Sequence, residues 1–256
     1  MSPALINQLS RGKFVYRCKD EWGDILVMDK GDDRILTFDS IHEQSRLNKK
    51  QPALLVHLYT RAMLLGLALI APRHVTMLGL GSGCLLQAFD KMLTATAISV
   101  VEYRTLVVEV AKKYFWLPTS DNIAIAVADA ETYLEASATA STDIIFSDLY
   151  NAEDMHPLQL QTSFLLDCHR VLTEGGWLVA NFHHLPDTTS EFFTTLEKYF
   201  EEILIFTIPT ENYIIYAGKQ RLVADLDSYV SRTGQFPHSD KLHYEKLFRR
   251  LVRLTI

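Results

Sequence analysis

The stretch Val75-Thr-Met-Leu-Gly-Leu-Gly-Ser-Gly83 decides the fold, because a short β-type run ends there in three alternating glycines. Glycine has no Cβ, so a bound nucleoside could approach this turn closely. A second strand-like run, Ala97–Glu102, ends in a carboxylate 21 positions beyond Gly81. At that spacing a carboxylate can accept both ribose hydroxyls. The sequence therefore predicts a nucleoside site built from Gly79, Gly81, Ser82, Gly83 and Glu102.

The chain from residue 75 onward alternates between strand-like and helix-like segments, which predicts a parallel sheet covered on both faces. The runs at 202–206 and 213–218 flank Pro209 and indicate an antiparallel pair at the sheet edge. We therefore expect an α/β fold with a Rossmann-like, doubly wound, mostly parallel sheet. The predicted strands cover 75–79, 97–102, 123–127, 143–148 and 177–181, and the predicted helices 83–92, 105–115, 130–136, 158–172 and 188–200, with Gly175-Gly176 as a helix stop.

The ends of the chain have patterns of their own. Residues 13–40 predict a small antiparallel unit, because two apolar runs flank the turn-rich tetrad Lys30-Gly-Asp-Asp33. Apolar residues at helical spacing after Pro52 predict one helix that Pro72 ends. Leucines near the C-terminus indicate an amphipathic helix. The expected division is a β unit over 1–50, a nucleoside-binding catalytic domain over 51–220 and a helical extension over 221–256.

Charge and composition exclude some classes of partner. The formal charge of −6 gives no electrostatic footprint for nucleic acid, and no basic cluster exceeds the pair Arg249 and Arg250. The most apolar window, residues 53–71, is interrupted by polar side chains, and its uninterrupted part is too short to span a bilayer. We expect no nucleic-acid or membrane partner.

Cysteine usage and the N-terminus favour a reducing compartment. The three cysteines are widely spaced and form no Cys-x-x-Cys motif, which argues against disulfides and a zinc knuckle. No secretory signal is visible at the N-terminus. His183-His184 lack further ligands at metal-site spacing and are interpreted as strand-end residues. The expectation is a cytoplasmic protein without a metal.

Asp129-Ala130 closes the third predicted strand and places a carboxylate where an adenine amine could donate to it. Alone, Asp129 could equally be the N-cap of the next helix. Glu102 and the glycine turn at successive strand ends favour a nucleoside of the S-adenosylmethionine type. Two alternatives stay open: a nicotinamide dinucleotide, which Cys84 disfavours because its fingerprint requires glycine there, and a tight turn without a ligand.

Asp148 ends the fourth strand and is the candidate catalytic residue. Alkyl transfer from a sulfonium requires an uncharged nucleophile, so an amine acceptor must lose a proton, and a carboxylate near the line of attack can take it. The following loop carries Tyr150, Asp154 and His156 and resembles a polar lid over an acceptor pocket. We expect Tyr150 and Asp154 to bind the acceptor.

These features resemble the spermidine synthase (polyamine aminopropyltransferase) family over roughly residues 14–218. Gln44 resembles the family glutamine that meets the nucleoside, and Tyr59 lies where a pocket tyrosine is expected. The glycine turn, Glu102, Asp129-Ala130 and Asp148 match in order. The resemblance implies transfer of an aminopropyl group from decarboxylated S-adenosylmethionine to a small amine such as putrescine, with methylthioadenosine as product, and a homodimer or larger assembly.

Three departures from the family pattern leave other functions open. Ser82 replaces an aspartate that is expected to hold the cofactor's amine. Thr60-Arg61 replaces His-Glu, and an arginine near a diamine would repel it. The loop after Asp148 lacks the usual Asp-Pro. The leading hypothesis is aminopropyl transfer with Asp148 as general base, and the alternatives are an S-adenosylmethionine-dependent methyltransferase and a non-catalytic nucleoside-binding relative.

Overall fold

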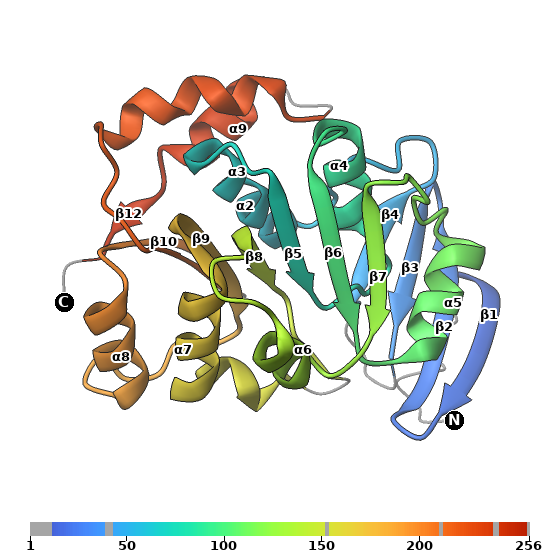
Figure 1. The fold of residues 1–256 in the computed structure, drawn as a ribbon. Coiled ribbons are helices and arrows are strands. Elements are labelled where there is room, and N and C mark those ends of the chain that lie inside the picture. The colour runs from blue at the N-terminus through green and yellow to red at the C-terminus, as the bar shows by residue number, and fades with distance from the viewer. Residues whose placement is uncertain (1–11, 39–42, 152–153, 210–211, 238–240, 255–256) are drawn as a thin grey trace.

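The computed structural model describes residues 12–38, 43–151, 154–209, 212–237 and 241–254, and two β-sheets organise them (Figure 1). In the larger sheet of this described part, five neighbouring strands pair in parallel, as the α/β alternation predicts. These parallel strands, in spatial order, are β9 (Leu172–Phe182), β8 (Thr142–Ser147), β5 (His74–Leu78), β6 (Ala97–Glu102) and β7 (Ile123–Val127).

The order of strands reverses beside β5. From β5 the chain continues to β6 and β7 on one side, and then crosses to β8 and β9 on the other. Open α/β sheets bind ligands beyond the carboxyl ends of the strands at such a switch point. A ligand site is therefore expected at the residues that follow β5 and β8.

The antiparallel pair near the C-terminus is present but is not the sheet edge. Strand β11 (Asn212–Gly218) lies between β9 and β10 (Glu202–Ile208), and β12 (Val252–Arg253) from the tail pairs with β10 beyond it. The tail therefore completes the main sheet.

The Gly175-Gly176 pair does not end a helix. Strand β9 begins directly after the preceding helix and includes both glycines. The pairing of β8 with β9 shifts register between Thr142 and Ile144, and a Cβ on Gly176 would lie 3.1 Å from the carbonyl oxygen of Asp143. Gly176 therefore serves a close strand approach at an irregularity, which is a common use of glycine in sheets, while a Cβ on Gly175 would meet open space.

Helices cover both faces of the main sheet (Figure 1). The first face carries α2, α3 and α4, with the C-terminal elements packed outside them. The second face carries α6, α7 and α8. The bounds are α2 (Leu58–Leu64), α3 (Gly66–Leu69), α4 (Cys84–Met92), α6 (Ala130–Ala136), the 3-10 helix η1 (Pro157–Leu160), α7 (Thr162–Val171), α8 (Glu191–Tyr199), the 3-10 helix η2 (Leu226–Gln235) and α9 (Lys241–Phe248).

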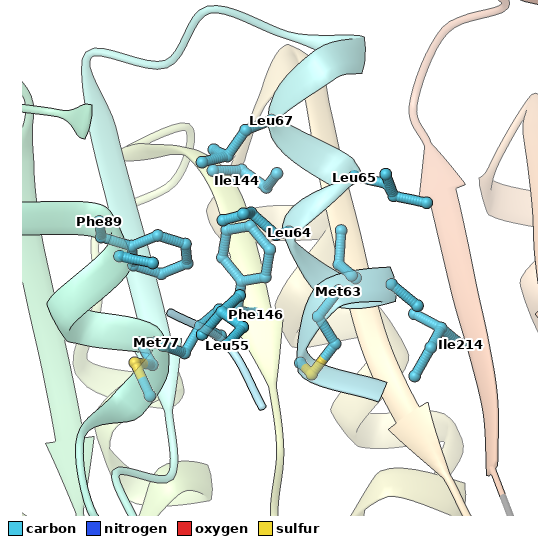
Figure 2. Close-up of a cluster of buried hydrophobic side chains, with 14 of the residues drawn as sticks. Leu55, Met63, Leu64, Leu65, Leu67, Met77, Phe89, Ile144, Phe146 and Ile214 are labelled. Atoms are coloured by element: carbon cyan, nitrogen blue, oxygen red, sulfur yellow. The ribbon is translucent and has the colours of Figure 1, made fainter. Parts of the chain in front are cut away.

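The single helix predicted between Pro52 and Pro72 is two short helices. Figure 2 shows Met63 and Leu64 of α2 among side chains of the sheet. Helix α3 starts at Gly66, where a Cβ would lie 2.6 Å from Cγ2 of Val179 in β9. The glycine lets the helix lie close against the sheet, and burial of the apolar residues around it stabilises the fold by about 25 cal/mol per Å².

A second, antiparallel sheet lies at the N-terminus. The hairpin predicted around Gly31 is confirmed, and two further strands extend it. The sheet packs on α5 (Thr105–Tyr114) through a separate apolar cluster that includes Ile25, Leu36 and Val107. Its strands, in order, are β1 (Lys13–Asp20), β2 (Gly23–Lys30), β3 (Asp33–Thr37) and β4 (Ser45–Asn48).

Candidate active site

A cavity of about 920 Å³ opens at the carboxyl ends of the parallel strands. Its size lies in the upper range of small-molecule sites. The ends of β5, β6, β7, β8 and β9 contribute to its wall, together with the start of β11 and parts of the N-terminal sheet. Nine of the residues predicted from the sequence line it: Gln44, Tyr59, Gly79, Gly81, Glu102, Asp129, Ala130, Asp148 and Tyr150.

The glycine turn after β5 lies directly against the backbone that follows β8. Gly79 has a φ of +90°, which favours glycine, and a Cβ there would lie 2.4 Å from the carbonyl oxygen of Asp148. The Gly79 N–H donates to the Val101 carbonyl at 2.9 Å. The turn is therefore held between two neighbouring strand ends.

Ser82 and Gly83, expected to bind the cofactor, do not line the cavity. The Ser82 side chain is fully buried, and its main-chain N–H donates to Ser45 Oγ of β4 at 3.3 Å. Gly83 precedes α4, and a Cβ there would overlap Leu117. After Gly81 the turn runs into the protein interior, so Ser82 and Gly83 are packed against other residues and not against the cavity.

Glu102 ends β6 and is a buried carboxylate. Its Oε2 accepts from the Leu80 N–H at 3.0 Å, and its Oε1 accepts from the Arg104 N–H at 2.9 Å. Burial raises the pKa of Glu102, while these main-chain hydrogen bonds oppose the rise. A carboxylate has about four acceptor sites, and main-chain groups, with Gly81 as the third, use three of them, so Glu102 can still accept from a hydroxyl in the cavity.

Asp129 follows β7 and caps α6. Its Oδ1 accepts from the Thr132 N–H at 3.0 Å, which is the N-cap hydrogen bond considered from the sequence. Asp129 also lines the cavity with Ala130. The two interpretations of this residue are therefore compatible, because one oxygen caps the helix and the other is not used by that bond.

Asp148 follows β8 at the switch point and faces the cavity. Its N–H donates to the Leu78 carbonyl at 2.9 Å, and its Oδ1 accepts from Asn181 Nδ2 at 2.8 Å. Desolvation raises the pKa of Asp148 to about 6, and the Asn181 hydrogen bond opposes that rise. A carboxylate with such a pKa is ionised at neutral pH and is a stronger base than an exposed aspartate.

Asn181 and Asn212 are buried cavity residues that the sequence analysis did not select. Asn212 Nδ2 donates to Asn181 Oδ1 at 2.9 Å, and Tyr150 Oη donates to the Asn181 carbonyl at 3.1 Å. Gln159 Nε2 also donates to that carbonyl at 3.2 Å. Asn181 lies near the end of β9, so its position at a strand end was a signal that could have identified it.

Tyr59 of α2 and Cys84 of α4 line the cavity near Asp148. Tyr59 Oη donates to the Gln44 carbonyl at 3.3 Å. Desolvation raises the pKa of Tyr59 well above its usual value and that of Cys84 to about 11, and the Asp148 carboxylate adds to both shifts. Both side chains are therefore protonated and neutral at physiological pH.

The N-terminal sheet supplies an aromatic part of the cavity wall. Trp22 and Tyr103 are half-exposed, and their ring centroids are 4.8 Å apart in an edge-on arrangement. The Arg104 guanidinium lies 4.6 Å above the Phe38 ring and pairs with Asp20 at 2.7 Å. These contacts attach the β1–β2 turn to the segment that follows Glu102.

Asp154, expected to bind the acceptor, does not line the cavity. Its exposed carboxylate accepts from the Met155 N–H at 2.7 Å and pairs with His183 Nδ1 at 3.2 Å. The Met155 hydrogen bond is the largest cause that lowers the pKa of Asp154. His183 and His156 do line the cavity, so Asp154 contacts a residue of the cavity wall without belonging to it.

Arg61 does not face the acceptor region, which corrects the repulsion expected from the sequence. Its Nε donates to the Leu55 carbonyl at 2.5 Å, and its Nη1 lies 3.2 Å from His243 Nε2 in α9. The residue is absent from the cavity wall of the described chain. The arginine therefore joins the tail to α2 and gives no argument against a cationic acceptor.

Neither a metal site nor a membrane span is found among the described residues. They contain no cluster of three or more His, Cys, Asp or Glu side chains arranged to hold a metal ion. Within the same ranges, no helix has the length and apolar character that crossing a bilayer requires.

Curated proteins are similar in sequence to this chain. No protein-family model matches it. The polyamine aminopropyltransferase of Neisseria meningitidis is 28% identical over 199 residues, which cover 76% of this chain and 74% of the relative. That of Vibrio vulnificus is 25% identical over 219 residues, with 83% and 72% covered.

Solved structures share the fold. A probable spermidine synthase from Corynebacterium glutamicum superposes with a TM-score of 0.76 at 20% identity and covers 91% of this chain and 93% of that one. Human methyltransferase-like protein 13 in complex with SAH gives 0.61 at 22% identity, with 75% and 92% covered. The doubly wound fold is thus common to both groups, while the curated sequence relatives are aminopropyltransferases. This chain is therefore similar in sequence to polyamine aminopropyltransferases and similar in fold to spermidine synthases.

Proposed function

We propose that the protein transfers an aminopropyl group from decarboxylated S-adenosylmethionine to a small amine, with Asp148 as general base. The observation that carries the proposal is Asp148 itself, which faces the cavity at the switch point with a pKa of about 6. The curated relatives named polyamine aminopropyltransferase support the reaction class. A related spermidine synthase structure contains the transition-state analogue AdoDATO.

The cavity suits a nucleoside donor. Glu102 can accept from a ribose hydroxyl, Asp129 from an exocyclic amine, and Gly79 and Gly81 leave room for the backbone to approach the ligand. Gln44 would meet the nucleoside from the N-terminal sheet, and Ser82 and Gly83 would contribute through the shape of the turn. The volume of about 920 Å³ leaves space for an acceptor beside the donor.

The acceptor would lie between Asp148, Tyr59 and Tyr150. Its ammonium gives one proton to the Asp148 carboxylate, and the neutral nitrogen attacks the methylene carbon next to the sulfonium. A carbon–nitrogen bond forms as the carbon–sulfur bond breaks, and sulfur leaves as the neutral thioether of methylthioadenosine. The mildly acidic pKa of Asp148 suits this proton transfer, because such a base is ionised before the reaction and strong enough to assist it.

Methyl transfer from S-adenosylmethionine is the second candidate. Ser82 stands where the family has an aspartate for the donor's amine, and its side chain is buried outside the cavity. The cavity wall contains the neutral residues Ser45, Thr60 and Cys84, and none of them offers a carboxylate to that amine. Human methyltransferase-like protein 13, bound to SAH, has the same fold, and fold alone does not select between the reactions.

Product analysis separates these functions. The protein is incubated with either sulfonium donor and a panel of mono-, di- and polyamines, and the nucleoside products are resolved by chromatography. Methylthioadenosine that appears only when an amine is present supports aminopropyl transfer, and S-adenosylhomocysteine supports methyl transfer. Tight methylthioadenosine binding without any product would instead favour a non-catalytic relative.

Four further properties belong to this proposal. The chain is divided into a β unit over 1–50, a catalytic domain over 51–220 and an extension over 221–256. It forms a homodimer, as light scattering at micromolar concentration would detect. It acts in the cytoplasm, and it uses no metal, so that activity is retained in a chelator.

A further inference from the structure

Four polar side chains form a continuous hydrogen-bonded chain that ends at Asp148. Tyr150 Oη donates to the carbonyl oxygen of Asn181, and it also has a hydrogen bond with the Asn212 side chain. Asn212 Nδ2 donates to Asn181 Oδ1 at 2.9 Å, and Asn181 Nδ2 donates to Asp148 Oδ1 at 2.8 Å. Asn181 is 2% exposed and Asn212 is 7% exposed, so bulk water competes little with these bonds.

The direction of every bond in this chain follows from one main-chain group. The Asn181 carbonyl can only accept, so the Tyr150 hydroxyl must donate its one proton there. The Tyr150 oxygen then accepts from Asn212, which must turn its NH₂ group toward it. The second N–H of that group meets Asn181 Oδ1, and this leaves the NH₂ group of Asn181 to face Asp148.

We propose that Asn212, acting through Asn181, is a positioning residue that keeps an N–H donor directed at Asp148. The inference rests on the proposed function in that Asp148 is the proton acceptor there. If the Asn181 amide were reversed, its oxygen would face the carboxylate, and Asp148 would have to be protonated to make the bond. The chain of amides therefore keeps Asp148 able to accept a proton at neutral pH.

The other titratable groups near Asp148 do not replace this donor. They come from three elements: Tyr59 from α2, Cys84 from α4 and Tyr150 from the loop after β8. The pKa of each is raised by burial, so all three are neutral at physiological pH. For Asp148, the hydrogen bond from Asn181 is the contribution that lowers the pKa against desolvation.

The decisive experiment is a ¹³C NMR titration of the Asp148 carboxyl carbon in the full-length protein. The resonance is assigned by its loss in Asp148→Asn. Asn212→Leu and Asn181→Leu should each raise the pKa of Asp148 by about one unit, the size expected for loss of a directed hydrogen bond. The double variant should match Asn181→Leu alone, because Asn212 acts through Asn181.

Two results would overturn the proposal. The first is an Asp148 titration that neither single variant changes. The second is a rise in the pKa of Asp148 that Asn212→Leu causes equally in the wild type and in Asn181→Leu. Asn212 would then act independently of Asn181. Asn122→Leu is the matched control: Asn122 Nδ2 donates to the Leu93 and Thr96 carbonyls elsewhere, and its loss should leave the Asp148 titration unchanged.

Tyr150→Phe covers the case in which Asn212→Leu does not fold. It removes the hydroxyl that fixes the direction of the chain and keeps the ring, so the pKa of Asp148 should rise by a smaller amount. An unchanged pKa in Tyr150→Phe would contradict the direction argued here. The titration needs no turnover. If the protein has no transferase activity, the proposed function is wrong, but the positioning role of Asn212 can still be tested.

Discussion

A β-carbon at position 79 would lie 2.4 Å from the carbonyl oxygen of Asp148, so the glycine turn and the proposed base are in backbone contact. This contact arises because β5 and β8 are parallel neighbours that end together, with Leu78 opposite Ser147. The donor turn and the base are therefore positioned by the same strand pair.

Gly79→Ala should destabilise the fold and the site together. The φ of +90° and the overlap with Asp148 both oppose a side chain, and a left-handed backbone alone costs about 1–2 kcal/mol. We expect a lower midpoint of thermal unfolding and weaker methylthioadenosine binding by calorimetry. Gly175→Ala is the control, because no atom lies within 4 Å of the position that its Cβ would take, and it should leave both measurements unchanged. Equal behaviour of the two variants would contradict the assigned contact.

Asp148→Asn should lower kcat for aminopropyl transfer by about 10²–10⁴-fold, the range for loss of a general base. Methylthioadenosine affinity should change little, because the amide keeps the shape of the side chain. Asp154→Asn is the matched control, since that carboxylate is exposed and outside the cavity wall. Turnover that survives in Asp148→Asn but not in Asp154→Asn would reverse the assignment.

The pH dependence of kcat/KM should rise through the pKa of Asp148, about 6, and then level off. Below that value the carboxyl is protonated and cannot accept the proton of the amine. Initial rates measured across this range, with the donor at subsaturating concentration, test the expectation. A rate that is flat from about one unit below to one unit above this pKa would exclude Asp148 as the titrating base.

Asp148 should also make stability depend on pH. Its folded pKa of about 6 exceeds the usual value of 3.8, so the unfolded chain releases the proton first as pH rises. The free energy of unfolding should therefore fall between these two values, by at most roughly 3 kcal/mol. Asp148→Asn should be more stable than the wild type at neutral pH and similar to it well below the lower value, as thermal unfolding at both pH values can measure.

Trp22→Ala should weaken methylthioadenosine binding by about 3–10-fold, the effect of losing one aromatic contact. Trp22 lies in the cavity wall beside Tyr103, although it belongs to the turn between β1 and β2. Trp116→Ala is the control, because Trp116 is similarly exposed but lies outside the cavity wall. Equal affinities for Trp22→Ala and the wild type would remove Trp22 from the nucleoside site.

The sequence predicted the central α/β pattern well because the strands are apolar and bounded by clear turns. The bounds of β6, β7 and α6 agree with those predicted, and β5 differs by a single residue at each end. The prediction was wrong where tertiary contacts override local signals. Gly175 and Gly176 belong to a strand because β8 and β9 shift register there, which no local pattern reveals.

The candidate site was predictable where a residue follows a parallel strand. Glu102, Asp129 and Asp148 belong to this class and line one cavity. Asn212 begins an antiparallel strand, and Trp22 comes from a turn of the other sheet, so their approach depends on how distant elements pack. The direction of Arg61 was not predictable either, because its partner His243 is far along the chain.

Residues from both sheets form the cavity wall, and the Arg104–Asp20 ion pair joins the two sheets close to Trp22. A molecule that touches both walls must favour their closed association over their separation, by thermodynamic linkage. Resistance of the β1–β2 turn to proteolysis should therefore report occupancy. A fragment that starts at residue 51 would contain all the strands of the main sheet but would lack the N-terminal wall of the cavity.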